Sequence, residues 1–200
     1  MTAQIEDIFY YKRQEHSLVA ISDDIGFKPQ MYGIKPSSVF TACWAGYWCE
    51  YSITTKGLFL KNLYIHSKNE KYPPINGVEV TEVSDDDWRM GHNVYKNLKL
   101  PMKYTGKILL GNDFISRYYI HMGYQRSWAY KHLYEFEFKD GKLINRIDLS
   151  DTAAKQRAIL DASDIDPRYP DGGDIFKFVE DSFSLDYSVK AQDFKIDEAN

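Results

Sequence analysis

The chain has 200 residues, enough to bury most of the surface that the unfolded chain would expose. Its 44% hydrophobic and 27% charged residues exclude wholesale disorder and a collagen-like repeat, and two cysteines exclude a disulfide-dense scaffold. The sequence contains no run of 18 apolar residues, so no membrane-spanning helix is predicted. The first residues lack the basic-then-apolar layout of a secretory signal. The sequence therefore predicts a cytoplasmic protein with no membrane partner.

Charge is distributed unevenly along the chain, whose formal net charge is −4. Residues 161–200 carry 11 acidic and 4 basic side chains, whereas residues 1–160 carry 18 acidic and 21 basic ones. An acidic C-terminal fifth repels phosphates, so no nucleic-acid partner is expected there. The acidic residues indicate either simple solvation or a basic protein partner. The 16 tyrosines are typical of a β-rich core with tyrosine at its margins, or of an aromatic binding surface.

The first half of the chain alternates β-prone runs with turns. A first hairpin is predicted from two short runs, and residues 26–36, with two glycines and two prolines, are expected to form a loop. In 47–54, Cys49, Tyr51 and Ile53 alternate with polar residues, which indicates a strand with one polar face. The expected strands are 7–12, 17–22, 39–44, 47–54 and 58–65, with 55–57 as a hairpin loop.

The middle of the chain is less regular. We expect a polar loop over 66–77, the start of a short helix at 85–88 and an extended segment over 100–106. Strands are predicted over 107–110 and 114–122, separated by a turn at 111–113.

A second hairpin is predicted over 128–150, with its turn at Asp140-Gly141. It resembles the hairpin around Gly57, and a bulge at Gly57 is expected to absorb the one-residue difference between them. A decayed duplication and two hairpins built by the same physics both explain the likeness; the second is favoured because the pattern is generic. Each return strand is expected to place four alternating residues on one of its faces. These are Phe59, Lys61, Leu63 and Ile65 in the first hairpin, and Leu143, Asn145, Ile147 and Leu149 in the second.

The C-terminal segment, 151–200, is predicted to be helical and acidic. Helices are expected over 151–162 and 174–183, and the last dozen residues are expected to fray. The second helix should place Ile175, Phe176, Val179 and Phe183 on one apolar face. The resulting fold class is α+β: a single domain, 1–200, with a predominantly antiparallel sheet of about eight to ten strands and two short C-terminal helices.

The candidate binding residues fall in three groups. If 117–121 is a strand, Arg117, Tyr119 and His121 share one face and could bind an anion, with Arg126 joining from the following turn. A solvated sheet face is the alternative. The other candidates are Trp44 and Trp48, as exposed aromatic anchors, and the acidic residues Asp164, Asp166 and Asp171.

No metal, cofactor or catalytic motif is predicted. The histidines form no metal-binding spacing, and the spacing from Asp164 does not fit a calcium loop. Cys43 and Cys49 lack the spacing of a zinc pair or a redox pair, so both are expected to be structural.

Three functions are consistent with these features. The favoured one is a non-enzymatic, cytoplasmic protein-binding domain of the immunity or inhibitor type, which occludes a basic partner such as a nuclease toxin. The alternative is a small-ligand-binding protein or hydrolase that uses the Arg117, Tyr119 and His121 face. A third is a sugar-binding domain with Trp44, Trp48 and Trp88 as stacking platforms. The oligomeric state is not predicted.

Overall fold

The computed structural model describes residues 2–83, 93–163, 166, 168 and 174–190, and it confirms the α+β class. The described strands form one ten-stranded mixed sheet, in which β1 and β3 are parallel and the other paired strands are antiparallel. Its order is β10-β9-β8-β2-β1-β3-β4-β6-β5, with β7 beside β4. The strands are β1 (Ile8–Tyr11), β2 (Gln14–Ile21), β3 (Tyr47–Thr54), β4 (Gly57–Ile65), β5 (Thr81–Glu82), β6 (Asn93–Tyr95), β7 (Leu100–Pro101), β8 (Gly106–Phe114), β9 (Tyr130–Lys139) and β10 (Lys142–Asp148).

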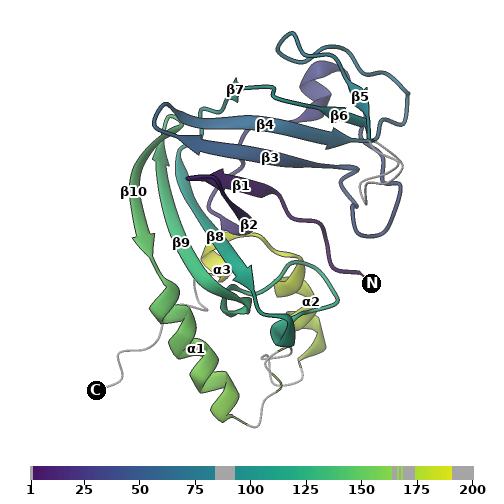
Figure 1. Ribbon diagram of the computed structural model, residues 1–200. Coiled ribbons are helices and arrows are strands. Elements are labelled where there is room, and N and C mark those ends of the chain that lie inside the picture. Colours follow the sequence, from purple (N-terminus) through teal and green to yellow (C-terminus); the bar gives the residue numbers. More distant parts are fainter. Residues whose placement is uncertain (1, 84–92, 164–165, 167, 169–173, 191–200) are drawn as a thin grey trace.

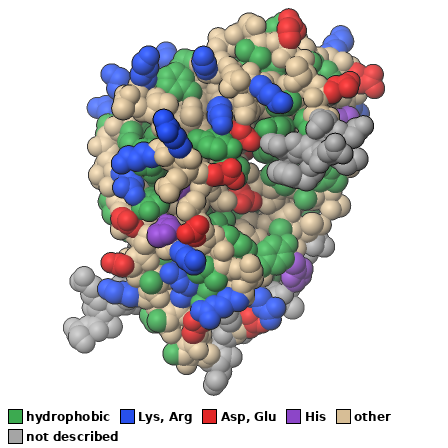
Figure 2. Space-filling model, viewed as in Figure 1, with side chains coloured by type: hydrophobic (Ala, Val, Ile, Leu, Met, Phe, Trp, Pro, Cys, Tyr) green, Lys and Arg blue, Asp and Glu red, His purple; other side chains and the backbone are tan. Residues whose placement is uncertain are grey.

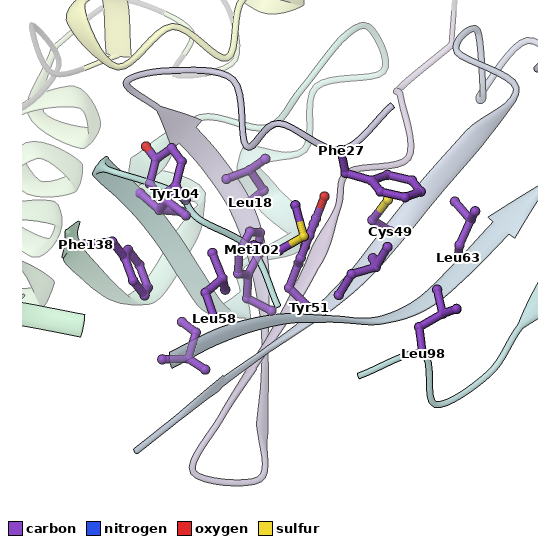
Figure 3. Close-up of a cluster of buried hydrophobic side chains, with 14 of the residues drawn as sticks. Leu18, Phe27, Cys49, Tyr51, Leu58, Leu63, Leu98, Met102, Tyr104 and Phe138 are labelled. Carbon is purple, nitrogen blue, oxygen red and sulfur yellow. The ribbon is translucent and has the colours of Figure 1, made fainter. Parts of the chain in front are cut away.

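The sheet is curled around its main core. In Figure 1, β3 and β4 cross the top of the view while β8, β9 and β10 run downward, and the first hairpin, β1 and β2, lies between these two arms. Figure 3 shows side chains from both arms meeting in one buried cluster, among them Tyr51 of β3, Leu58 of β4 and Phe138 of β9. The arms also touch at their ends, because the Leu58 amide donates to the carbonyl of Gly141 at 2.8 Å. Because the sheet is curled, strands that are far apart in the chain contribute side chains to one hydrophobic cluster.

The bulge expected at Gly57 lies farther along β4. Tyr51 pairs with Leu60 and Glu50 pairs with Asn62, so Lys61 is the extra residue, although Gly57 has the expected positive φ, +134°. A bulge reverses the alternation of side chains between faces. The predicted single face is therefore wrong, and the residues that reach the core from both sides of the bulge are Leu58, Leu60, Leu63 and Ile65.

Strand β10 is an edge strand, and the apolar face predicted for it is also wrong. A bulge at Ile144 interrupts its pairing with β9. Leu143 is half-buried against the core, whereas Ile147 is 42% exposed. Among the described strands, β10 has a neighbour only on the β9 side, and the alternation of its residues does not reveal this edge position.

Two other local predictions are wrong. Residues 39–44 form bends and turns instead of a strand. The turn expected at 111–113 is absent, because β8 runs without interruption from Gly106 to Phe114. Gly111 serves close packing there: a β-carbon at this position would overlap the ring of Tyr130. The predicted helix start at 85–88 lies outside the described residues.

Helices cover the lower end of the sheet in Figure 1: α1 (Ser150–Ala162), α2 (Ile175–Phe183) and the short α3 (Tyr187–Lys190). The first two match the predicted helices, and the Asp174 carboxylate caps α2 by accepting from the Lys177 amide. The apolar face predicted for α2 is not the face that packs throughout, since Phe176 is 88% exposed and Phe178, outside that face, is buried. Within the described residues, no helix has the length and apolar character needed to cross a bilayer.

Candidate functional site

The structure does not place Arg117, Tyr119 and His121 on one strand face. Strand β8 ends at Phe114, and residues 116–118 form a turn of 3-10 helix. The Arg117 guanidinium bonds Tyr118 and pairs with Asp161 of α1 at 2.5 Å, while Tyr119 is 45% exposed. His121 is exposed in a bend. The shared face was predicted from strand alternation, which this segment does not have.

The remaining predicted residues have different surroundings. Arg126 is buried, with its guanidinium carbon 5.8 Å from the centre of the Trp128 ring. Trp44 is 53% exposed but stacks on Phe183, with ring centres 4.8 Å apart. Trp48 is buried and stacks on Tyr64. Asp166 forms an ion pair with Arg168 at 2.6 Å, and Asp164, Asp171 and Trp88 lie outside the described residues.

A different site stands out in the centre of the sheet. Three glutamates, Glu6 before β1, Glu15 on β2 and Glu50 on β3, line a cleft of about 650 Å³. Figure 2 shows acidic side chains gathered around a hollow near the middle of this face, where β1 and β3 pass in Figure 1. None of the described residues that line the cleft is basic. We call this site the acidic cleft; it is lined by Ala3, Gln4, Ile5, Glu6, Ile8, Tyr10, Glu15, Ser17, Trp48 and Glu50.

Strand register explains how residues from three parts of the chain reach the acidic cleft. Tyr10 of β1 pairs with Glu15 of β2, and Ile8 pairs with Glu50 of β3 on its other side. Paired residues point to the same face of a sheet. Neighbouring residues on the same strands, such as Phe9 and Tyr51, point the other way into the main core. The parallel pairing of β1 with β3 is what brings the N-terminal segment next to Glu50.

Hydrogen bonds from side chains hold the carboxylates of Glu15 and Glu50 in place. The Tyr10 hydroxyl donates to Glu15 Oε2 at 3.2 Å, and the Asn62 amide donates to Glu50 Oε2 at 2.6 Å. Glu50 is only 7% exposed. The carboxylates are thus oriented before any ligand arrives, which lowers the entropy cost of binding.

The electrostatics of the acidic cleft are those of a negative site. Burial raises the pKa of Glu6, and the nearby charge of Glu15 adds to that rise, while a hydrogen bond from Ser17 opposes it. Burial, followed by the charges of Glu50 and Glu15, raises the pKa of the Tyr10 hydroxyl. A cation already approaches this region: Lys61 Nζ lies 3.6 Å from the centre of the Tyr10 ring. Carboxylates beside an aromatic face are suited to bind an ammonium or guanidinium group.

Both cysteines are buried and reduced, as expected for structural residues. Burial raises the pKa of the Cys43 thiol to about 11 and that of Cys49 well above its ordinary value. Because the thiolate is the nucleophilic form, neither thiol is activated at neutral pH. The described residues also hold no group of three or more His, Cys, Asp or Glu side chains arranged to bind a metal ion.

Sequence reasoning missed the acidic cleft. The alternation in 47–54 does place Glu50 on a polar face, and this was the one local signal available. Nothing in the local pattern connects Glu6 and Glu15 to it, because their proximity depends on pairing between β1 and β3.

Comparison of the chain with protein-family models, with curated proteins and with solved structures finds no match. The function must therefore be argued from the geometry of the acidic cleft.

Proposed function

We propose that this chain is a non-enzymatic, cytoplasmic protein-binding domain of the immunity or inhibitor type, and that its acidic cleft contacts a basic surface of the partner. The observation that carries the proposal is the convergence of Glu6, just before β1, with Glu15 of β2 and Glu50 of β3 around one cleft without a basic side chain in its described lining. A nuclease toxin is one class of partner with such a basic surface.

The physical argument has two parts. Carboxylates gathered on one face speed the approach of a positively charged partner and disfavour acidic ones. The half-buried ring of Tyr10 borders the same cleft, so that a lysine or arginine side chain of the partner would meet both charge and ring surface. Glu15 and Glu50 stand on strands β2 and β3 of the central sheet, which keeps their spacing fixed, and Glu6 lies two residues before β1.

The alternative functions have less support from the arrangement of the described residues. A ligand site formed by Arg117, Tyr119 and His121 would need these side chains to converge, and Arg117 is instead engaged with Tyr118 and Asp161. A sugar-stacking surface would need open indole faces, and Trp48 is buried against Tyr64. We therefore propose neither of them.

The test is a binding experiment with matched charge variants. The doubly substituted Glu6→Gln/Glu15→Gln protein removes two charges from the acidic cleft and leaves Glu50, which is bonded to Asn62, unchanged. The control, Glu70→Gln/Glu82→Gln, removes two charges from exposed residues elsewhere. Each protein is immobilised and incubated with extract of the source organism at low ionic strength. Any stoichiometric partner is then purified for affinity and activity measurements.

We expect the wild type and the control to retain a basic protein and to inhibit its activity. The cleft variant should bind it at least about tenfold more weakly, and the difference should shrink as salt is added. Recovery of no stoichiometric partner would contradict the proposal, and so would a partner that binds the cleft variant as tightly as it binds the wild type.

A further inference from the structure

Strand β10 presents an open edge. Among the described strands it pairs only with β9, and two of its apolar side chains are exposed, Ile144 by 56% and Ile147 by 42%. An edge strand carries a row of unpaired backbone donors and acceptors, which is a template for another strand. Natural edges are commonly protected by charges or proline; here charged Arg146 and Asp148 flank the exposed Ile147.

The direction of the free backbone groups follows from one hydrogen bond. The Leu149 amide, one residue beyond β10, donates to the carbonyl of Leu133 at 2.8 Å and so points toward β9. In an antiparallel ladder, residues that point to one neighbouring strand alternate with residues that point to the other. The amide and carbonyl groups of Asp148 and Arg146 therefore point outward, and those of Ile147 point toward β9.

We propose that two copies of this chain pair antiparallel along β10, about a two-fold axis at Ile147. In that register, each Arg146 lies opposite Asp148 of the second copy. The outward-pointing backbone amide and carbonyl groups of these two residues form hydrogen bonds across the interface. Ile147 lies opposite Ile147 of the second copy, and this pair on the axis forms no backbone hydrogen bond across the interface. The two curled sheets become one continuous sheet.

Side-chain chemistry selects this register over its neighbours. Arg146 and Asp148 pair with Phe136 and Tyr134 of β9, so both lie on the same face of the sheet and can form two symmetric ion pairs across the axis. The Arg146 guanidinium carbon lies 4.2 Å from the centre of the Tyr134 ring, which holds the side chain on that face. An axis at Arg146 would oppose two arginines, and an axis at Asp148 would oppose two aspartates.

Cross-linking tests the axis directly. Residues facing each other in a pair without backbone hydrogen bonds have Cα atoms roughly 4.5 Å apart, within the range that a disulfide spans. Ile147→Cys should therefore form a disulfide-linked dimer under mild oxidation, and native Cys43 and Cys49 are buried. The control is Asn145→Cys on the same strand, whose two copies would be separated by roughly 13 Å along the strands and should not link.

Charge exchange tests the register independently. Arg146→Asp or Asp148→Arg alone places like charges opposite each other and should weaken dimerisation in sedimentation experiments at least about tenfold. The double exchange restores opposite charges and should recover the wild-type dimerisation constant. Asp148 also accepts hydrogen bonds from Ser150, so the unfolding of each variant is measured in parallel. The Asp148→Arg protein and the double variant both lose these hydrogen bonds. Recovery of dimerisation in the double variant alone is therefore explained by complementary pairing.

Three results would overturn the proposal. The first is a wild-type protein that stays monomeric up to concentrations of about 1 mM. The second is equal cross-linking of Ile147→Cys and Asn145→Cys. The third is a dimer whose dissociation constant is unchanged by the single charge exchanges or is not restored by the double exchange.

Discussion

The carboxyl group of Asp7 is expected to make the stability of this protein depend on pH near neutrality. Asp7 precedes β1, and its side chain accepts a hydrogen bond from the Cys49 amide at 2.7 Å. Burial raises its pKa from the ordinary value of 3.8 to about 7, the hydrogen bond from Cys49 opposes that rise, and the charge of Glu6 adds to it. Asp7→Asn keeps an acceptor for the amide and removes the titration.

The direction of the effect follows from proton linkage. The folded state binds the Asp7 proton more tightly than the unfolded state, so this group favours folding fully below about pH 4 and loses that contribution as the pH rises through 7. With pKa values of 3.8 unfolded and about 7 folded, the free energy of unfolding that Asp7 contributes falls by about 2–3 kcal/mol between pH 5 and pH 8. Burial lowers the pKa of His16, which makes stability change with pH in the opposite direction.

The measurement is urea unfolding of the wild type and of Asp7→Asn at several pH values from 5 to 8. The difference between the two proteins isolates Asp7 from His16, which is present in both. We expect the variant to gain about 2–3 kcal/mol relative to the wild type over this interval, and Glu70→Gln, an exposed control, to follow the wild-type profile. Parallel profiles for Asp7→Asn and the wild type would refute the reasoning.

Two further predictions concern packing. Gly141→Ala should destabilise the protein much more than Gly26→Ala in thermal unfolding. Both glycines have positive φ, which costs a residue with a β-carbon about 1–2 kcal/mol, but only at Gly141 would that carbon overlap the Met102 carbonyl, while the space around Gly26 is open. Phe136→Ala, in the main core, should cost about 3–5 kcal/mol, whereas Phe176→Ala, 88% exposed on α2, should lie within about 0.5 kcal/mol of the wild type; equal losses for the two phenylalanine variants would contradict the assigned core.

Local patterns predicted the elements of this fold better than their connections. Alternation identified β3 and β4, and Asp140-Gly141 has the positive φ values, +49° and +77°, that its two-residue hairpin turn requires. Alternation failed where a single bulge changes the face of every later residue, as at Lys61 and Ile144. It also failed at 114–122, where β8 ends at Phe114 and the β-prone residues Ser116–Tyr118 form a 3-10 helix.

The candidate site depended on information that local patterns do not contain. Glu6, Glu15 and Glu50 become neighbours only because β1 inserts between β2 and β3, parallel to the latter. No turn chemistry specifies such a contact, since β2 and the long connection 22–46 lie between the two parallel strands in the chain. By contrast, Arg117, Tyr119 and His121 were grouped because a strand would place them on one face, and the 3-10 helix at Ser116–Tyr118 removes that alternation.

The central position of the first hairpin has a consequence for biosynthesis. Strands β1 and β2 are synthesised before the other strands of this sheet, yet their outer neighbours are β3, at residues 47–54, and β8, at residues 106–114. A nascent chain that ends before β8 leaves the β2 edge without its native partner, and that edge carries the apolar side chains of Leu18 and Val19. Pairing of the β2 edge must therefore await the synthesis of β8, and we expect slow, chaperone-sensitive maturation dominated by contacts of long sequence separation.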